Sequence, residues 1–327
     1  MKTFISIALL TASAVCVRAA PDMVGVSAAV DDVVMSFEQD RAPAPSSELA
    51  IFLLDVERGT TRLVADKVST DLTYCGSPSW SADGRRILFD ATPGQRFQLA
   101  RMQAVEVAGG ALRTREIGVG TAPTESPDGK RIAWWLNSGA EAGDSAGLWI
   151  MKADGSARTP LGVRSGGIPK WSPDGKRLLV SAFASPVSLD IVDLAGRIGP
   201  TVESISLKGG VFYSVPSWAG DGATMVAVVK VGGVVDFALI DVSKPDKAVF
   251  KRSLWRKGGG VSPAYPVYHP GTGQCVFAGR ERDGTVLYSF CVGEEPQRID
   301  PNGCRGKIAS LAFSPDGRYV LFCSVPE

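Results

Sequence analysis

The chain has 327 residues, 45% of them hydrophobic, and its 35 Lys and Arg residues nearly balance 34 Asp and Glu residues. It contains no run of basic residues and no basic tail, so its charge gives no support for a nucleic-acid partner or for binding to an anionic membrane. By length alone it could form two domains.

The N-terminus has the features of a signal peptide. Lys2 supplies a positive charge, residues 4–17 are apolar, and Ala19 offers a cleavage point, so residues 1–19 are predicted to be removed on export. We therefore expect a periplasmic or extracellular protein. The apolar run is too short to span a bilayer comfortably, and no other segment approaches that length, which predicts no transmembrane segment.

A short N-terminal extension, residues 20–32, precedes the first predicted strands. Residues 33–37 resemble a strand, and the apolar residues 49–54 and 61–64 predict two more. We find no convincing amphipathic helix after residue 30. The chain therefore reads as all-β.

From residue 80 onward one short phrase recurs six times, an aromatic residue followed by a turn such as Ser-Pro-Asp-Gly. The aspartates at positions 83, 128, 174 and 221 lie 45, 46 and 47 residues apart, which is close to one four-stranded propeller blade. The copies begin at Trp80, Glu125, Trp171, Trp218, Tyr268 and Phe313.

The repeated turn has a clear mechanism. Proline presets φ at the second position, and glycine adopts the left-handed conformation at little cost, which closes a short hairpin. We therefore expect each copy to join two antiparallel strands. A structural role in these turns is predicted for Asp83, Gly84, Asp128, Gly129, Asp174, Gly175, Asp221, Gly222, Asp316 and Gly317.

Apolar runs that follow the turns, such as residues 225–229, do not alternate with polar residues, as expected for strands buried on both faces. Third strands, such as residues 148–151, and shorter polar fourth strands, such as residues 158–161, come next. A β-sandwich would also have many short strands, but it would not require the same turn at a fixed period. We predict a β-propeller.

The two ends of the chain predict how the ring closes. The chain stops soon after its sixth hairpin, whereas residues 49–54 and 61–64 resemble a third and a fourth strand with no hairpin before them. Pairing these halves would close a six-bladed ring and leave no open edge. Residues 33–37 leave one alternative, a seventh, partial blade. In either case residues 33–327 form a single domain.

Cys16 lies in the signal peptide, and Ser13 to Cys16 match a lipidation box poorly, so we expect Cys16 to leave with the signal. An odd number of cysteines remains after cleavage. Either of two disulfides is possible, Cys75 with Cys304 or Cys275 with Cys291, and buried free thiols are the alternative, above all for Cys275, Cys291 and Cys323 in apolar strands. No spacing resembles a zinc site.

The repeat Trp171-Ser172-Pro173-Asp174-Gly175-Lys176-Arg177, followed by a short apolar strand, resembles the repeat of TolB-type β-propellers. Residues 313–318 match it closely, the first two copies differ at one position each, the fourth keeps the Trp and the Asp-Gly, and the fifth is eroded. The resemblance covers residues 33–327 and implies an exported propeller. TolB also has an N-terminal α/β domain, for which this chain has no room, so the resemblance is to the propeller module.

Two enzyme classes carry similar repeats. Oligogalacturonate lyases use several histidines around a metal, but this chain has only His269, which is predicted to be an exposed turn residue. Prolyl-oligopeptidase-type peptidases attach a hydrolase domain after the propeller, and here the chain stops without a Gly-x-Ser-x-Gly elbow. We therefore expect a non-catalytic monomer that needs no cofactor and no metal.

What remains is a binding surface. Loops that enter the innermost strands converge at one mouth of the central channel, and Tyr and Arg there are favoured interface anchors. We expect a protein, peptide or envelope component to bind at Asp71, Tyr74, Arg164, Tyr213, Tyr265 and Arg305. Two alternatives stay open. One is an enzyme acting on a carbohydrate or another small ligand through carboxylates at the channel mouth, and the other is a structural or assembly role.

Overall fold

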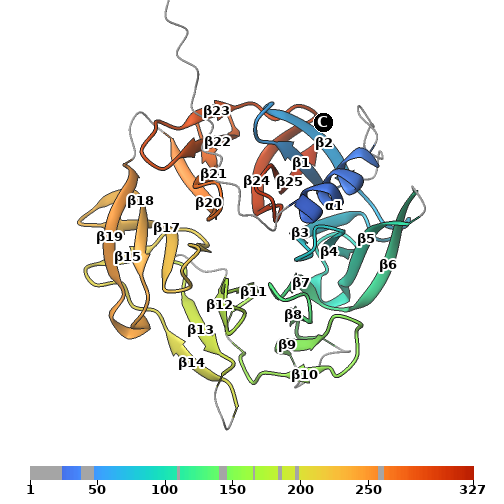
Figure 1. Ribbon diagram of the computed structural model, residues 1–327, viewed down its shortest axis with the longest axis horizontal. Coiled ribbons are helices and arrows are strands. Elements are labelled where there is room, and N and C mark those ends of the chain that lie inside the picture. The colour runs from blue at the N-terminus through green and yellow to red at the C-terminus, as the bar shows by residue number, and fades with distance from the viewer. Residues whose placement is uncertain are drawn as a thin grey trace, which may run out of the picture.

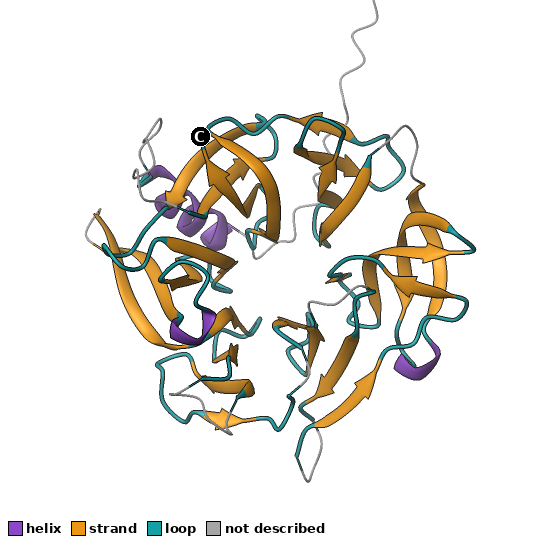
Figure 2. Ribbon diagram, turned by 180° about the vertical axis from the view of Figure 1, so that it is seen from behind, coloured by secondary structure: helices purple, strands orange, loops and turns teal. Residues whose placement is uncertain are grey.

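The computed structural model describes residues 24–37, 48–108, 111–139, 146–164, 166–182, 186–195, 199–256 and 261–327. The predicted signal peptide and Cys16 lie outside these residues. Six antiparallel sheets surround a central axis (Figures 1 and 2). The prediction of a six-bladed β-propeller is confirmed.

Each blade runs from an innermost to an outermost strand. Blade I comprises β3 (Tyr74–Trp80), β4 (Arg86–Thr92), β5 (Arg101–Ala108) and β6 (Ala111–Val119). Blade II comprises β7 (Thr121–Glu125), β8 (Arg131–Leu136), β9 (Gly147–Lys152) and β10 (Thr159–Pro160). Blade III comprises β11 (Ile168–Trp171), β12 (Arg177–Ser181), β13 (Leu189–Asp193) and β14 (Thr201–Ser204).

Blade IV has its inner strand in two pieces, β15 (Gly210–Phe212) and β16 (Ser217–Trp218), followed by β17 (Thr224–Val231), β18 (Val234–Asp241) and β19 (Val249–Arg256). Blade V comprises β20 (Ser262–His269), β21 (Gln274–Arg280), β22 (Thr285–Cys291) and β23 (Gln297–Ile299). Two short 3-10 helices, Phe97–Leu99 and Pro245–Lys247, lie in connections.

Blade VI closes the ring with strands from both ends of the chain. Its inner strands are β24 (Cys304–Phe313) and β25 (Tyr319–Pro326), and its outer strands are β1 (Ala50–Asp55) and β2 (Thr60–Ala65). β1 pairs with β25 in a continuous register in which Phe52 lies opposite Phe322, with ring centroids 5.5 Å apart. This is the closure that the sequence predicts, and it leaves neither half of the blade unpaired.

The apolar core lies between neighbouring blades, which explains why apolar and polar residues do not alternate along the strands that follow the turns. Met225, Val226, Ala227, Val228 and Val229 are all fully buried, because one face of β17 packs toward blade III and the other toward blade V. Across the blade IV–V interface, the rings of Phe237 and Phe277 have centroids 5.5 Å apart. A strand between two such packed layers has no solvent-facing side to make polar.

Helix α1 (Val24–Met35) corrects the expectation of a strand at residues 33–37 and of no helix after residue 30. Val26, Val30, Val33, Val34 and Phe37 recur at helical spacing and pack on the core between blades VI and I. Figure 1 shows α1 beside β1, β2 and β3. The five-residue apolar run at 33–37 is therefore the end of a helical stripe, and α1 passes through the predicted boundary at residue 32.

The helix rests on two of the repeated turns. In blade VI, Arg318 Nη2 bonds to Asp31 Oδ1 at 2.8 Å and to the Ser27 carbonyl at 3.1 Å. In blade I, Gly84 has φ of 71°, and a Cβ there would lie only 2.6 Å from the Val30 side chain. Glycine at this turn thus supplies both the left-handed conformation and the room for α1.

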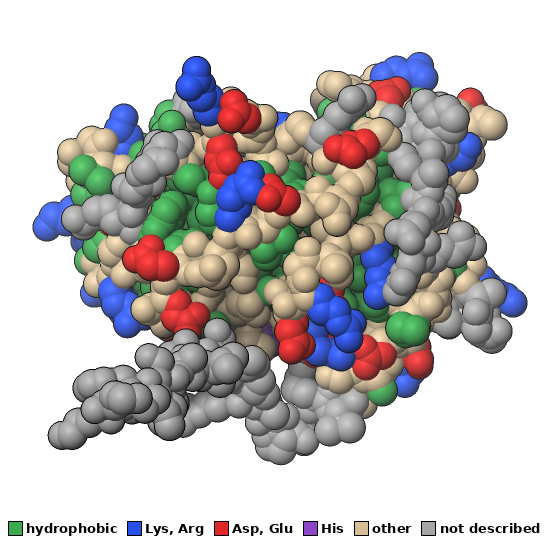
Figure 3. All heavy atoms as spheres, turned by 90° about the horizontal axis from the view of Figure 1, so that it is seen from above, with side chains coloured by type: hydrophobic (Ala, Val, Ile, Leu, Met, Phe, Trp, Pro, Cys, Tyr) green, Lys and Arg blue, Asp and Glu red, His purple; other side chains and the backbone are tan. Residues whose placement is uncertain are grey.

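The five described cysteines are free thiols, so neither candidate disulfide is formed in the structure. Cys75, Cys275, Cys304 and Cys323 are buried, and burial raises the pKa of Cys304 to about 11. Among the described residues no helix is long and apolar enough to cross a membrane. Figure 3 shows basic and acidic side chains interspersed over one side of the molecule, consistent with the near-zero net charge.

Candidate functional site: the central channel

The repeated turns are built by one hydrogen-bond pattern. In blade II, Asp128 Oδ1 accepts from Ser126 Oγ at 2.6 Å and from the Lys130 N–H at 3.1 Å, while the Arg131 N–H donates to Ser126 Oγ at 3.0 Å. These bonds to Ser126 and Lys130 hold the pKa of Asp128 below its usual value. The same bonds recur around Asp83, Asp174 and Asp316.

The fourth and fifth turns use other side chains. In blade IV, Thr224 replaces the missing serine, and its hydroxyl donates to Asp221 Oδ2 at 2.7 Å. In blade V, His269 is half-buried rather than exposed as predicted, because its Nε2 lies 3.0 Å from the Pro315 carbonyl of the next blade. His269 Nδ1 lies 3.2 Å from the Thr272 N–H. The one histidine is therefore held within its turn.

The tryptophans of the third and fourth phrases tie their blades to the preceding ones. Trp171 Nε1 donates to the Thr124 carbonyl and Trp218 Nε1 donates to the Lys170 carbonyl, both at 3.0 Å. A guanidinium from the preceding blade covers each indole, with Arg131 4.7 Å from the ring centre of Trp171 and Arg177 5.3 Å from that of Trp218. Such cation–π contacts stabilise neighbouring blades in their relative positions.

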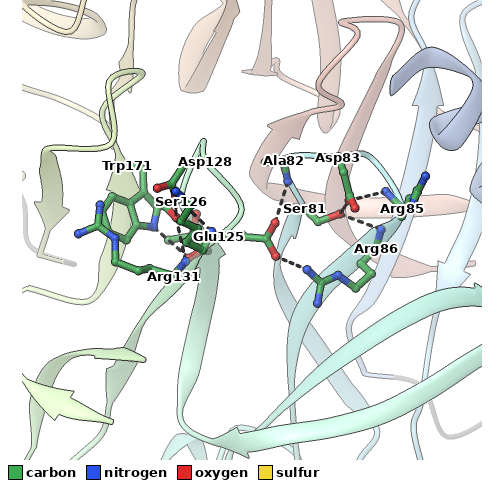
Figure 4. Close-up of polar contacts among 12 residues, drawn as sticks. Ser81, Ala82, Asp83, Arg85, Arg86, Glu125, Ser126, Asp128, Arg131 and Trp171 are labelled. Atoms are coloured by element: carbon green, nitrogen blue, oxygen red, sulfur yellow. Dashed lines mark hydrogen bonds and ion pairs between the residues drawn. The ribbon is translucent and has the colours of Figure 1, made fainter. Parts of the chain in front are cut away.

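Glu125 replaces the aromatic residue in blade II, and an ion pair takes the place of the cation–π contact. Its carboxylate lies 2.5 Å from Arg86 Nη2 and accepts from the Ala82 N–H at 3.1 Å, both in blade I (Figure 4). The Glu125 side chain is 1% exposed. Burial raises the pKa of Glu125, and the nearby Arg86 opposes that rise.

A second repeated signal, which the sequence reasoning missed, marks the channel wall. A proline stands two positions before the first residue of five of the six phrases, at Pro78, Pro123, Pro169, Pro216 and Pro266. Proline is tolerated at a sheet edge because it needs no ladder partner for an N–H. The innermost strands are such edges. In the pattern Pro-x-aromatic, the residue x between the proline and the aromatic residue therefore lies beside the axis of the ring.

These intervening residues line a cavity of about 340 Å³ on the axis of the ring. One comes from each blade: Ser79, Thr124, Lys170, Ser217, Val267 and Ala312. Blades I to IV thus contribute polar side chains and blades V and VI apolar ones. Ser79 Oγ donates to the Pro123 carbonyl at 2.7 Å, and Lys170 Nζ donates to the Pro216 carbonyl at 3.0 Å, in each case in the next blade.

The described residues that line this cavity include one carboxylate, that of Glu125, and one amine, that of Lys170. The carboxylate is engaged by Arg86 and the Ala82 N–H. The alternative of an enzyme acting on carbohydrate needs two carboxylates about 5–9 Å apart, and the described lining does not supply the second. Burial lowers the pKa of Lys170 to about 8.

Four inner strands have a bulge three residues before the first residue of their phrase. The bulge residues have φ angles of 47–55° and are Ser77, Ala122, Tyr265 and Ser310. Non-glycine residues in this conformation cost about 1 kcal/mol each. Two of the bulges are held from the neighbouring blade. Asp90 Oδ2 accepts the Ala122 N–H at 2.8 Å, and Ser214 Oγ accepts the Tyr265 N–H at 2.7 Å.

Of the six predicted mouth residues, the structure brings Tyr74 and Tyr265 near each other. Burial raises the pKa of Tyr74 to about 12, and Cys323, Asp90, Glu48 and Tyr265 add to that rise in decreasing order. Tyr265 also lines the cavity. The two tyrosines come from blades I and V, on either side of blade VI.

The other four predicted residues are not among the described residues that line the cavity. Asp71 is in the loop before β3, Arg164 is in the connection between β10 and β11, and Arg305 is on β24 opposite Val325. Tyr213 follows β15 and is 49% exposed. These positions belong to different parts of the ring, and a shared binding site at them stays a prediction. No group of three or more metal-binding side chains occurs within the described ranges.

Comparisons with known proteins support the fold and correct one prediction. No family model matches the chain. A peptidase of Bacillus subtilis (strain 168), YuxL, itself named as uncharacterized, is 24% identical over 208 residues, which is 62% of this chain. The chain spans 29% of that relative.

Among solved structures, TolB from Acinetobacter baumannii is 17% identical, with 84% of this chain and 63% of that chain covered and a TM-score of 0.49. A chain from a structural analysis of two prolyl endopeptidases is 14% identical, with 90% of this chain and 47% of that chain covered and a TM-score of 0.51. A chain of a nidogen/laminin complex is 10% identical, with 85% and 98% covered and a TM-score of 0.51. At these identities the likeness to the two chains with a TM-score of 0.51 shows a shared fold alone.

The expectation that this chain is not an enzyme is therefore wrong. It rested on the missing nucleophile elbow and the single histidine, whereas the curated relative is named as a peptidase.

Proposed function

We propose that this propeller works in peptide hydrolysis, outside the cytoplasm, by binding the peptide substrate in its central channel. The observation that carries the proposal is the axial cavity of about 340 Å³, which is bounded by the innermost strands of all six blades. Small-ligand pockets typically measure about 300–1,000 Å³. The similarity to a protein named as a peptidase supports peptide as the ligand, and the predicted signal peptide supports export.

The wall of the cavity suits an extended peptide. Its prolines and aromatic rings offer apolar contact, whereas its hydroxyls and strand carbonyls can bond to peptide groups. Two of these carbonyls, those of Pro123 and Pro216, already accept from Ser79 and Lys170, which holds the wall in a defined shape before a ligand arrives. A wall that is already ordered loses less entropy on binding.

In this proposal the channel holds the peptide substrate, and the described residues of its wall contribute binding to hydrolysis. His269, the one histidine, is engaged with Pro315 and Thr272 and does not line the cavity. It is therefore not placed to act as the base for a channel serine. Substrate selection by the channel would precede the chemical step.

The test combines binding with cleavage. A panel of peptides of three to six residues is titrated into the full chain by calorimetry, and the mixtures are analysed for cleavage by mass spectrometry. Ala312→Trp places a large side chain in the channel and should abolish binding, whereas Val249→Trp, on the exposed face of β19, should leave it unchanged. The proposal fails if no peptide binds, or if Ala312→Trp binds as tightly as the unaltered chain.

A further inference from the structure

One corner of the channel is polar in a way that the turn network does not explain. Lys170 extends from β11 toward blade IV, where its ammonium donates to the Pro216 carbonyl at 3.0 Å. The next residue, Ser217, is 8% exposed, and its hydroxyl has no hydrogen-bond partner among the described residues. Both side chains line the cavity.

The ammonium of Lys170 is only partly satisfied. A lysine ammonium has three donors, and one of them is used by Pro216. No carboxylate of the described residues forms an ion pair with Lys170, and Glu125, the one acidic side chain of the lining, is bonded to Arg86. Since burial lowers the pKa of Lys170 to about 8, most of the amine remains charged at neutral pH.

A buried hydroxyl without a partner carries a free-energy cost, and a partly desolvated charge without a counter-ion carries a larger one. A single ligand group could satisfy both. It must accept hydrogen bonds, carry negative charge and fit beside the small residues Thr124 and Ser79. A carboxylate meets these conditions, since it can accept from Lys170 Nζ, and the neighbouring Ser217 offers a hydroxyl donor that no described residue uses.

We propose that Lys170 and Ser217 form a subsite for the carboxylate at the C-terminus of a bound peptide. This inference rests on the proposed function, because it assigns a direction to the peptide in the channel. The terminal carboxylate would lie between blades III and IV, and the rest of the peptide would extend past the apolar positions Val267 and Ala312. The channel would then select peptides by their free end.

The first experiment compares a tripeptide such as Ala-Pro-Ala with its C-terminal amide by calorimetry. The free acid should bind the unaltered chain about tenfold more tightly, which is the size of one charge-assisted hydrogen bond. Lys170→Met should erase this preference, and Ser217→Ala should reduce it. Lys176→Met, at an exposed turn lysine, is the matched control and should retain it.

The second experiment does not depend on peptide binding. Propionate is added during limited amine acylation, and the modification of each lysine is followed by mass spectrometry. Propionate should slow acylation of Lys170 and leave that of Lys176 unchanged. If peptides bind but acid and amide bind equally, the subsite is overturned while the proposed function stands. If no peptide binds, the proposed function fails. If propionate also leaves the acylation rate of Lys170 unchanged, the subsite is overturned as well.

Discussion

The ion pair between blades I and II gives the sharpest test of how adjacent blades are joined. Arg86→Met removes the cation that faces Glu125, whose side chain is 1% exposed. Unit charges about 4 Å apart attract by about 4 kcal/mol at an effective dielectric constant of about 20. The stranded carboxylate would keep one bond, from the Ala82 N–H. We expect the free energy of unfolding to fall by about 3 kcal/mol near pH 7.

The loss should depend on pH, and the direction follows from the Glu125 carboxyl. Burial already raises its pKa above that of the unfolded chain, and loss of Arg86 would raise it further. A group of this kind opposes folding at high pH, and the opposition disappears as it becomes protonated. The deficit of Arg86→Met should therefore shrink as the pH falls from 7.5 to 4.5.

The assay is urea unfolding followed by tryptophan fluorescence at both pH values. Arg85→Met is the matched control, since Arg85 is exposed and its substitution should change stability by less than about 0.5 kcal/mol. A double-mutant cycle with Glu125→Gln isolates the pairwise term. The reasoning is refuted if Arg86→Met loses no more stability than Arg85→Met, or if its deficit is the same at pH 4.5 and pH 7.5.

Two further predictions concern the turns and the aromatic contacts. Burial lowers the pKa of His269, so the NMR resonance of this histidine should titrate below 6.5. The free energy of unfolding should decline as the pH falls from 6.5 through the pKa of the folded state, and His269→Gln should lack this decline. A pKa at or above 6.5 would contradict the prediction. Trp218→Phe should lower the free energy of unfolding in urea by about 1 kcal/mol more than Trp80→Phe. The reason is that Trp218 Nε1 donates to the Lys170 carbonyl, whereas Trp80 Nε1 has no partner among the described residues. Equal losses would argue against a stabilising role for that bond.

Much of the architecture could be predicted because its cause is local. The Ser-Pro-Asp-Gly turn is specified within six residues, as the bonds around Asp128 show, and its recurrence fixes six hairpins. The closure could be predicted because strands without hairpins occur at one end and hairpins without outer strands at the other. Helix α1 was missed because residues 33–37 were considered without Val26 and Val30, which complete the helical stripe.

The candidate site was only partly predictable. Tyr265 could be predicted near the channel because it lies at the entrance to an inner strand, but Lys170 was not predicted, although Pro-x-aromatic marks its position. A lone lysine in a sequence is most often a solvated side chain. That no carboxylate of the described residues pairs with it becomes visible only when six segments, each about 45 residues apart, are placed around one axis.

By itself the sequence determined the turns, the strands, the blade period and the pairing of the two ends, because each follows from short-range backbone preferences and from the periodicity of apolar residues. Tertiary structure alone decided that Glu125 meets Arg86, that α1 covers the joint between blades VI and I, and that Lys170 and Ser217 share one channel. Those contacts join residues distant in the chain, and their energies depend on which groups become buried together when the ring closes.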